Sequence, residues 1–228
     1  MDYGTPLKES DETVNVTING ISVNVPKGNS IMAAALLHDI AIPKLCATDN
    51  LEAYGSCRVC LVEVDGMRGF PASCTTPVAD KMVVRTDSEA LARVRKGVLQ
   101  LYLSDFPKSD IPDGWSEFHR TLQQVGVVDH PYSPVETHLQ APIDQSNPYF
   151  LFDPAKCIVC NRCVRACEEI QGTFALSIGG RGFDSKVIAG QDQTFFESNC
   201  VSCGACVQTC PTQALVEKSL FPEGYQRG

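Results

Sequence analysis

The stretches CIVCNRCVRAC (157–167) and CVSCGACVQTCP (200–211) contain two matching runs of cysteines. The first run is Cys157, Cys160, Cys163 and Cys167, and the second is Cys200, Cys203, Cys206 and Cys210. Both have the spacing C-x2-C-x2-C-x3-C, which is typical of chains that bind two 4Fe–4S clusters. Three thiolates at this spacing can wrap one corner of a cubane and reach three irons. The fourth points away at the start of a helical turn, so it can serve the other cubane.

The predicted ligand sets therefore cross over between the two runs. One 4Fe–4S cluster is assigned to Cys157, Cys160, Cys163 and Cys210, and the other to Cys167, Cys200, Cys203 and Cys206. The alternative is a pair of zinc sites, because C-x2-C also begins zinc ribbons. A zinc site takes four ligands, usually as two separated pairs, and has no use for the third and fourth cysteines of each run. The repetition of the whole pattern favours iron and sulfide.

Composition limits the class of protein. A chain of 228 residues suits one or two domains. Its first ten residues, MDYGTPLKES, lack the basic and apolar regions of a signal peptide, and no run of 18 apolar residues is present. Clustered cysteines without an export signal are more often metal ligands than disulfides, so we expect a cytoplasmic protein without a membrane span. The net charge of −8 argues against nucleic acid as a partner.

The N-terminal part predicts a hairpin followed by a helix. TVNVTI (13–18) and ISVNV (21–25) alternate apolar and polar residues around Asn19-Gly20, which is a strong hairpin signal. Ser30 is expected to cap a helix over 31–38. Hairpin, helix and then a cysteine-bearing loop is the order of elements in a β-grasp ferredoxin.

Four further cysteines follow this hairpin and helix. Cys46, Cys57, Cys60 and Cys74 have the spacing C-x10-C-x2-C-x13-C, which suits a 2Fe–2S cluster with two sulfur ligands on each iron. Gly55 and Ser56 are expected to bend the backbone and offer N–H groups to the sulfurs. The long spacings carry less information, so a zinc site plus free buried cysteines remains the alternative. We predict one 2Fe–2S and two 4Fe–4S clusters in total.

The predicted fold is α+β and has five parts. Residues 1–12 are a flexible arm, 13–87 a β-grasp 2Fe–2S domain, 88–148 a helix and proline-rich connector, 149–219 a domain with two 4Fe–4S clusters, and 220–228 a tail. The strands expected in the 4Fe–4S domain include a short one over 194–197. The connector begins with a helix over 89–104, on which Arg93, Arg95 and Lys96 are assigned to the solvated side. A second, short helical patch is expected near 115–125. Its histidines, His119, His130 and His138, are interpreted as solvated loop residues rather than metal ligands.

Three stretches carry a resemblance to a known family: FDPAKCIVCNRCVRACEEIQG (152–172), TFALSIGGRGF (173–183) and CVSCGACVQTCPTQALVEKS (200–219). Together with the 2Fe–2S motif they resemble the iron–sulfur subunits of NAD-linked electron-transfer complexes, over roughly residues 13–219. That family includes the N-terminal part of the large iron–sulfur subunit of respiratory complex I. It also includes the small diaphorase subunit of NAD-reducing nickel–iron hydrogenases and the N-terminal region of the α subunit of NAD-dependent molybdenum or tungsten formate dehydrogenases. The formate dehydrogenases look most similar.

Two departures from the family pattern matter. Many members have an extra 4Fe–4S cluster with one histidine ligand, in a stretch like LSDHP that is followed by three cysteines. Here residues 103–107 read LSDFP, with Phe106 in the histidine's place, and the three cysteines are absent, so we predict that this cluster is missing. The formate dehydrogenase α subunits also continue into a molybdopterin domain, whereas this sequence ends at Gly228. We therefore expect a separate catalytic subunit.

The resemblance implies an electron relay between a flavin- and NAD-binding diaphorase subunit and a molybdenum or tungsten subunit that oxidises formate or reduces carbon dioxide. FMN, NAD and the pterin are expected only on those partners. The near alternative is the same module in a nickel–iron hydrogenase or a bifurcating complex. Two other classes are a free ferredoxin-type carrier and a cluster-bearing sensor. No residue of the chain is identified as catalytic, because every candidate cysteine is assigned as a ligand.

Overall fold

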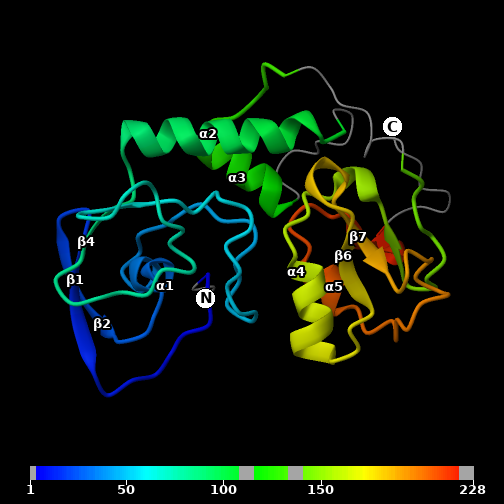
Figure 1. The fold of residues 1–228 in the computed structure, drawn as a ribbon, viewed down its shortest axis with the longest axis horizontal. Helices are drawn as coiled ribbons and strands as arrows, with labels where there is room; N and C mark the ends of the chain where they lie inside the picture. The colour runs from blue at the N-terminus through cyan, green and yellow to red at the C-terminus, as the bar shows by residue number, and fades with distance from the viewer. Residues whose placement is uncertain (1–3, 108–115, 133–140, 221–228) are drawn as a thin grey trace. The chain divides into compact units, whose positions relative to one another are not determined.

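The computed structural model describes residues 4–107, 116–132 and 141–220. The chain divides into two compact units (Figure 1). The first contains the residues up to Leu99 together with Gln124–Val127, and the second contains Gln100–Gln123 and the residues from Val128 onward. In the described ranges, no helix combines the length and the apolar character that crossing a membrane requires.

The first unit is built on a four-stranded mixed sheet in the order β2-β1-β4-β3. β1 (Thr13–Ile18) pairs antiparallel with β2 (Ile21–Pro26) and parallel with β4 (Val83–Arg85), and β3 (Glu63–Val64) pairs antiparallel with β4. The predicted hairpin is confirmed. Its turn residues Asn19 and Gly20 have φ of 51° and 82°, and two positive φ values are what a two-residue hairpin turn with the right twist requires.

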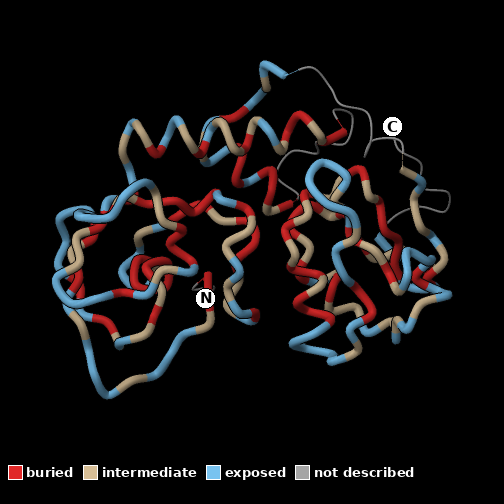
Figure 2. Tube along the Cα trace, viewed as in Figure 1, coloured by how far each residue is buried: buried red, intermediate tan, exposed pale blue. Residues whose placement is uncertain are grey.

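The core of this unit lies between the sheet and helix α1 (Ile31–Leu36). Val16 and Ile18 of β1 and Ile31 of α1 are fully buried, whereas Thr17, between the two strand residues, is partly exposed. Figure 2 marks the buried residues of the chain in red. The Ser30 hydroxyl accepts a hydrogen bond from the Ala33 N–H at 3.0 Å, so the predicted cap is confirmed. The helix ends at Leu36 instead of residue 38, because the chain continues as a turn.

Two helices were expected in the connector, and both are present. α2 (Glu89–Ser104) has the predicted bounds and begins where the Ser88 hydroxyl accepts the Leu91 N–H at 3.2 Å. α3 (Glu117–Val125) follows.

Two side chains of these helices were predicted wrongly. Arg95 of α2 and His119 of α3 were assigned to solvent, but they are only 8% and 4% exposed. His119 packs against Phe106 and Phe118 and shares a 2.6 Å hydrogen bond between its Nδ1 and the Ser116 hydroxyl. His138 lies outside the described residues.

The second unit contains two separate two-stranded sheets. β5 (Phe150–Phe152) pairs antiparallel with β8 (Leu215–Glu217), and β6 (Leu176–Gly179) pairs antiparallel with β7 (Lys186–Ala189). A further strand expected over 194–197 is wrong, because these residues form a hydrogen-bonded turn in which the Glu197 and Ser198 N–H groups bond to the Thr194 carbonyl.

Each cysteine run of this unit continues into a short helix. α4 (Arg162–Arg165) leads directly into a π-helical turn, η3 (Ala166–Gln171), and α5 (Ala205–Thr209) follows the second run. The remaining elements are the 3-10 turns η2 (Pro154–Lys156), η4 (Gly182–Asp184) and η5 (Lys218–Leu220). Cys167 lies on η3, and π-helical turns occur frequently at functional sites. The α+β fold class, with a ferredoxin-like domain at each end, is confirmed.

Candidate iron–sulfur centres

The four cysteines of the first unit converge in a buried site. Cys46, Cys57, Cys60 and Cys74 are all buried, and the Sγ atoms of Cys60 and Cys74 lie 3.4 Å apart. The Cys46 N–H donates to the Cys57 sulfur at 3.4 Å, and the Cys57 N–H donates to the Cys46 sulfur at 3.5 Å. The Cys46 thiol also bonds to the Cys74 thiol. Four sulfurs within mutual reach fit the donor set of a 2Fe–2S cluster.

These contacts lower the pKa of two of the four thiols and raise the pKa of the other two. Hydrogen bonds with Cys57 and Cys74 hold the pKa of Cys46 well below its usual range, and the hydrogen bond with Cys74 lowers the pKa of Cys60 to about 7. The same hydrogen bonds raise the pKa of Cys57 and Cys74, with burial adding to the rise. The site therefore already favours thiolates at Cys46 and Cys60, and the thiolate is the form that binds metal.

The loop before Cys57 takes its shape from a glycine. Gly55 has φ +74°, and a Cβ there would lie 3.1 Å from Cγ2 of Thr75. Arg58, between two predicted ligands, also has a positive φ of 55°. The Cys46 and Cys57 N–H groups reach sulfur in this loop, and Ser56 contributes its side chain to the Cys46 sulfur. Donation from the N–H groups of Gly55 and Ser56 stays a prediction.

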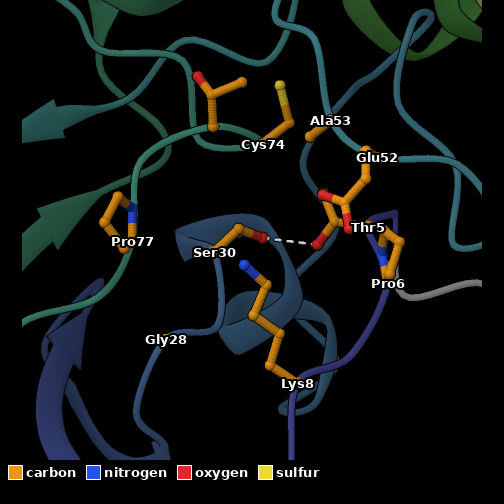
Figure 3. A pocket seen from close by; sticks show the side chains of 10 residues that line it. Thr5, Pro6, Lys8, Gly28, Ser30, Glu52, Ala53, Cys74 and Pro77 are labelled. Atoms are coloured by element: carbon orange, nitrogen blue, oxygen red, sulfur yellow. Dashed lines mark hydrogen bonds between the residues drawn. The ribbon is translucent and has the colours of Figure 1, made fainter.

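A pocket opens on the Cys74 side of this site (Figure 3). Thr5 and Lys8, from the stretch predicted as a flexible arm, line it together with Ser30, Glu52 and Cys74. The Thr5 and Ser30 hydroxyls share a 2.7 Å hydrogen bond, which Figure 3 marks. Thr5 is only 3% exposed. The segment before β1 therefore forms one wall beside the candidate 2Fe–2S site.

The eight cysteines of the second unit form two groups. Burial raises the pKa of Cys160, and the charges of Cys210 and Cys157 add to the rise. Burial also raises the pKa of Cys206 to about 12, with further contributions from Cys200, Cys203, Cys167 and Cys210. The fourth cysteine of each run thus lies near thiols of the other run, and Cys210 also lies near Cys206 of its own run. Binding of iron by these residues stays a prediction.

The two runs share a backbone device that the sequence did not reveal. Val159 and Ser202 have φ of 51° and 56°, and their N–H groups donate to the sulfurs of Cys157 and Cys200, both at 3.4 Å. A β-branched residue such as Val159 rarely adopts positive φ, which marks a strained position. The strain aims an N–H group at the first sulfur of each run. Val159 and Ser202 are different residue types, so the sequence carried one possible signal of this conformation, their equivalent positions in the two cysteine runs.

The second group of cysteines contains one exposed member, Cys203, whereas each cysteine of the first group is buried or half-buried. In the first group, Cys157 is half-buried and Cys160 and Cys163 are buried. Cys167 of this second group receives the Ala175 N–H at 3.3 Å and lies 3.3 Å from the Thr173 hydroxyl.

A buried arginine in an ion pair supports the first group. The Arg162 guanidinium, adjacent to Cys163, donates from Nη1 and Nη2 to the two carboxylate oxygens of Glu117 at 2.8 and 2.9 Å. Nη1 also reaches the Thr209 carbonyl at 3.1 Å, and Phe118 N–H bonds to the Pro211 carbonyl at 2.9 Å. The first turn of α3 is therefore linked to both neighbours of Cys210, directly to Pro211 and through Arg162 to Thr209. The sequence pattern did not indicate a role for Arg162, because the second repeat has an alanine, Ala205, at the equivalent position.

Phe106, at the place where related chains are expected to have a histidine ligand, is 3% exposed. Its ring lies 5.1 Å from that of Phe118 and 5.8 Å from that of His119. This position is therefore part of an aromatic cluster on the described part of the chain.

Comparison with known proteins agrees with this geometry. Residues 11–89 match the family described as "2Fe-2S iron-sulfur cluster binding domain", and residues 156–214 match the "4Fe-4S dicluster domain". The chain is 40% identical over 214 residues to the NADP-reducing hydrogenase subunit HndD of Solidesulfovibrio fructosivorans. It is 33% identical over 211 residues to the mitochondrial NADH-ubiquinone oxidoreductase 78 kDa subunit of Candida albicans. The chain is an iron–sulfur protein related to these subunits. It carries one 2Fe–2S domain and one domain for two 4Fe–4S clusters.

A solved structure extends the likeness to the whole of this iron–sulfur protein. A chain of an NAD+-reducing [NiFe]-hydrogenase in the H2-reduced state matches with a TM-score of 0.81 and 28% identity, and the match covers 93% of this chain and 92% of that chain. The curated relatives are longer. The matches to HndD and to the 78 kDa subunit each cover 90% of this chain but only 36% and 28% of those proteins. This chain therefore corresponds to only about a third of each of those proteins, and their names describe the longer proteins.

Proposed function

We propose that this iron–sulfur protein is an electron-relay subunit, which passes electrons between a flavin- and NAD(P)-binding diaphorase subunit and a separate catalytic subunit. The observation that carries the proposal is the combination of a 2Fe–2S domain and a dicluster 4Fe–4S domain, in a chain that resembles a hydrogenase subunit over nearly its full length. Bound iron–sulfur clusters supply one-electron chemistry. The chain's own residues supply thiolates, N–H groups aimed at sulfur, and burial that excludes water.

The proposed port for electron exchange with a partner is the loop that contains Cys203. This cysteine is exposed, and its neighbour Val201 is 55% exposed, although it is a large apolar residue. Thr173, Val201 and Cys203 line one pocket of the second unit, together with Cys167. Because electron tunnelling weakens steeply with distance, an exposed ligand is where a partner's redox centre would approach most closely.

We also propose that the histidine-ligated cluster of related chains is absent here, since Phe106 is packed among aromatic rings. Electrons would then cross between the 2Fe–2S and 4Fe–4S sites by another route, such as a cluster of a partner subunit.

Two catalytic partners are candidates. A molybdenum or tungsten formate dehydrogenase, which oxidises formate or reduces carbon dioxide, is favoured by the motif resemblance of residues 152–183 and 200–219. A hydrogenase is favoured by the 40% identity to a subunit of an NADP-reducing hydrogenase and by the likeness to a chain of an NAD+-reducing [NiFe]-hydrogenase.

The test is anaerobic purification of the natively expressed protein with everything that stays bound. Mass, metals and flavin are then measured on the same assembly. Molybdenum or tungsten together with flavin supports the formate dehydrogenase, and nickel together with flavin supports the hydrogenase. A lone chain that contains only iron contradicts the relay-subunit proposal and leaves a freely diffusing carrier.

A further inference from the structure

Arg95 is a buried cation beside the candidate 2Fe–2S site. It lies on α2 and is only 8% exposed, whereas Arg93 and Lys96 on the same helix are exposed. Its Nη1 donates to the Thr86 carbonyl at 2.9 Å, and its Nη2 donates to the Leu61 carbonyl. Leu61 directly follows the predicted ligand Cys60, so the guanidinium is hydrogen-bonded to the backbone of the ligand loop.

The positive charge of Arg95 interacts more strongly with the Cys60 thiolate than with the nearby carboxylate of Asp87. Both of its hydrogen-bond acceptors in the described part of the chain are backbone carbonyls. Burial lowers the pKa of Arg95, and the two charges that oppose this are the thiolate of Cys60, with the larger effect, and Asp87. A buried cation needs a counter-charge, because removal of a charge from water is expensive. The counter-charges here are Cys60, which is a predicted ligand of the cluster, and to a smaller extent Asp87.

Arg162 provides an internal contrast. It is also buried and also bonds to a carbonyl next to a predicted ligand, but Glu117 neutralises it with two hydrogen bonds. Arg95 and Arg162, two of the three buried arginines in the described part of the chain, thus differ in their partners; the third, Arg165, lies on α4 with Arg162. Arg95 has carbonyl partners at the 2Fe–2S site, whereas Arg162 belongs to a neutral ion pair with Glu117.

We propose that Arg95 is a positioning residue that raises the reduction potential of the 2Fe–2S site, by holding a buried positive charge against the Cys60–Leu61 segment. The inference rests on the 2Fe–2S assignment within the proposed function. Reduction adds one negative charge to the cluster, and a nearby cation stabilises the reduced form more than the oxidised form. Net charge and hydrogen bonding around the ligands are established determinants of cluster potential.

The experiment is a redox titration of the 2Fe–2S signal, followed by electron paramagnetic resonance on the full chain with its clusters assembled. Arg95→Met removes the charge and keeps much of the apolar stem. We expect the equilibrium constant for reduction to fall at least tenfold, which is 59 mV for one electron. Arg95→Lys keeps the charge and should retain most of the potential. Arg93→Met, on the exposed side of the same helix, is the control and should not move it.

A purely structural role for Arg95 gives a different pattern. It would lower the thermal stability of the Met and Lys variants while the midpoint potential of the assembled site stays at the wild-type value, and that result overturns the proposal. If Arg95→Met does not assemble, Arg95→Gln replaces it. Equal shifts in the Gln and Lys variants would then overturn the role of charge. A wild-type chain without a 2Fe–2S signal would overturn the proposed function itself, whereas a normal signal with an unshifted variant overturns this inference alone.

Discussion

Backbone conformation at single residues decides where sulfur atoms meet N–H groups. Val159 and Ser202 occupy the left-handed region and donate to Cys157 and Cys200 at the same distance of 3.4 Å. Gly55 also has a positive φ, at the 2Fe–2S loop, where an added Cβ would lie within 3.1 Å of the Thr75 side chain. The cluster loops therefore depend on a few residues whose dihedral angles are unusual, and substitution at these residues should matter more than their size suggests.

Gly55→Ala tests this at the 2Fe–2S loop. The added Cβ meets Thr75 at 3.1 Å on a backbone with φ +74°, so we expect a destabilisation of about 1–3 kcal/mol and faster loss of the 2Fe–2S signal on heating. The matched control is Gly97→Ala inside α2, where a Cβ meets nothing within 4 Å. There alanine should stabilise by up to about 1 kcal/mol. Anaerobic thermal melts followed by cluster absorbance measure both, and equal melting temperatures would contradict the role of Gly55.

The sequence predicted the ligand residues far better than their surroundings. Cysteine spacing is a property of the chain and can be read directly, whereas the burial of Arg95 depends on how α2 packs. One signal for Arg95 was available, because it stands four residues from both Leu91 and Leu99, which are fully buried. A position between two apolar residues on one helical face predicts burial whatever its charge. His119 was misjudged for a similar reason, since its partner Phe106 is distant in sequence.

At the scale of elements, α3 supports the first 4Fe–4S site through its first turn. Glu117 holds Arg162, and the Phe118 N–H bonds to the Pro211 carbonyl. The sequence indicated a helical patch in this region, but it gave no sign that the patch contacts the cysteine run. The contact joins residues 45 positions apart, and no local pattern reports such a pair. The hairpin of β1 and β2 was predictable because its register follows from Asn19-Gly20 alone.

Glu117→Gln should weaken this support. The variant leaves Arg162, whose side chain is 2% exposed, as a buried cation without its carboxylate partner. Loss of a charged hydrogen-bond pair costs about 2 kcal/mol at a site where Glu117 is one-third exposed, which corresponds to a fall of roughly 4–8 °C in Tm. Anaerobic thermal unfolding of the full chain measures it. Arg120→Gln on the exposed side of α3 is the control and should stay within about 0.5 kcal/mol of wild type. A Glu117→Gln melt that coincides with this control would show that the ion pair contributes nothing.

At the scale of the whole molecule, the chain combines two units that hold their cysteines differently. The 2Fe–2S site gathers four thiols from one long loop region, whereas in the second unit the two predicted ligand sets are shared between two repeats. The crossed assignment follows from the cysteine spacing of the two repeats and stays a prediction. The number of domains and their cofactors were therefore predictable. A partner could not be predicted in the same way, because the similar proteins carry the names of several different oxidoreductases.

Pairs of cysteine substitutions distinguish crossed from uncrossed ligation. The wild-type chain should contain about ten irons, from one 2Fe–2S and two 4Fe–4S clusters. With crossed sets, Cys157→Ala and Cys210→Ala damage the same cluster, so the double variant should retain about six irons, whereas Cys157→Ala with Cys167→Ala damages both clusters and should retain about two. Uncrossed ligation reverses the two results. Iron analysis combined with electron paramagnetic resonance reads out both variants, and the 2Fe–2S signal of the separate first unit should persist in each, as an internal standard that the chain has folded.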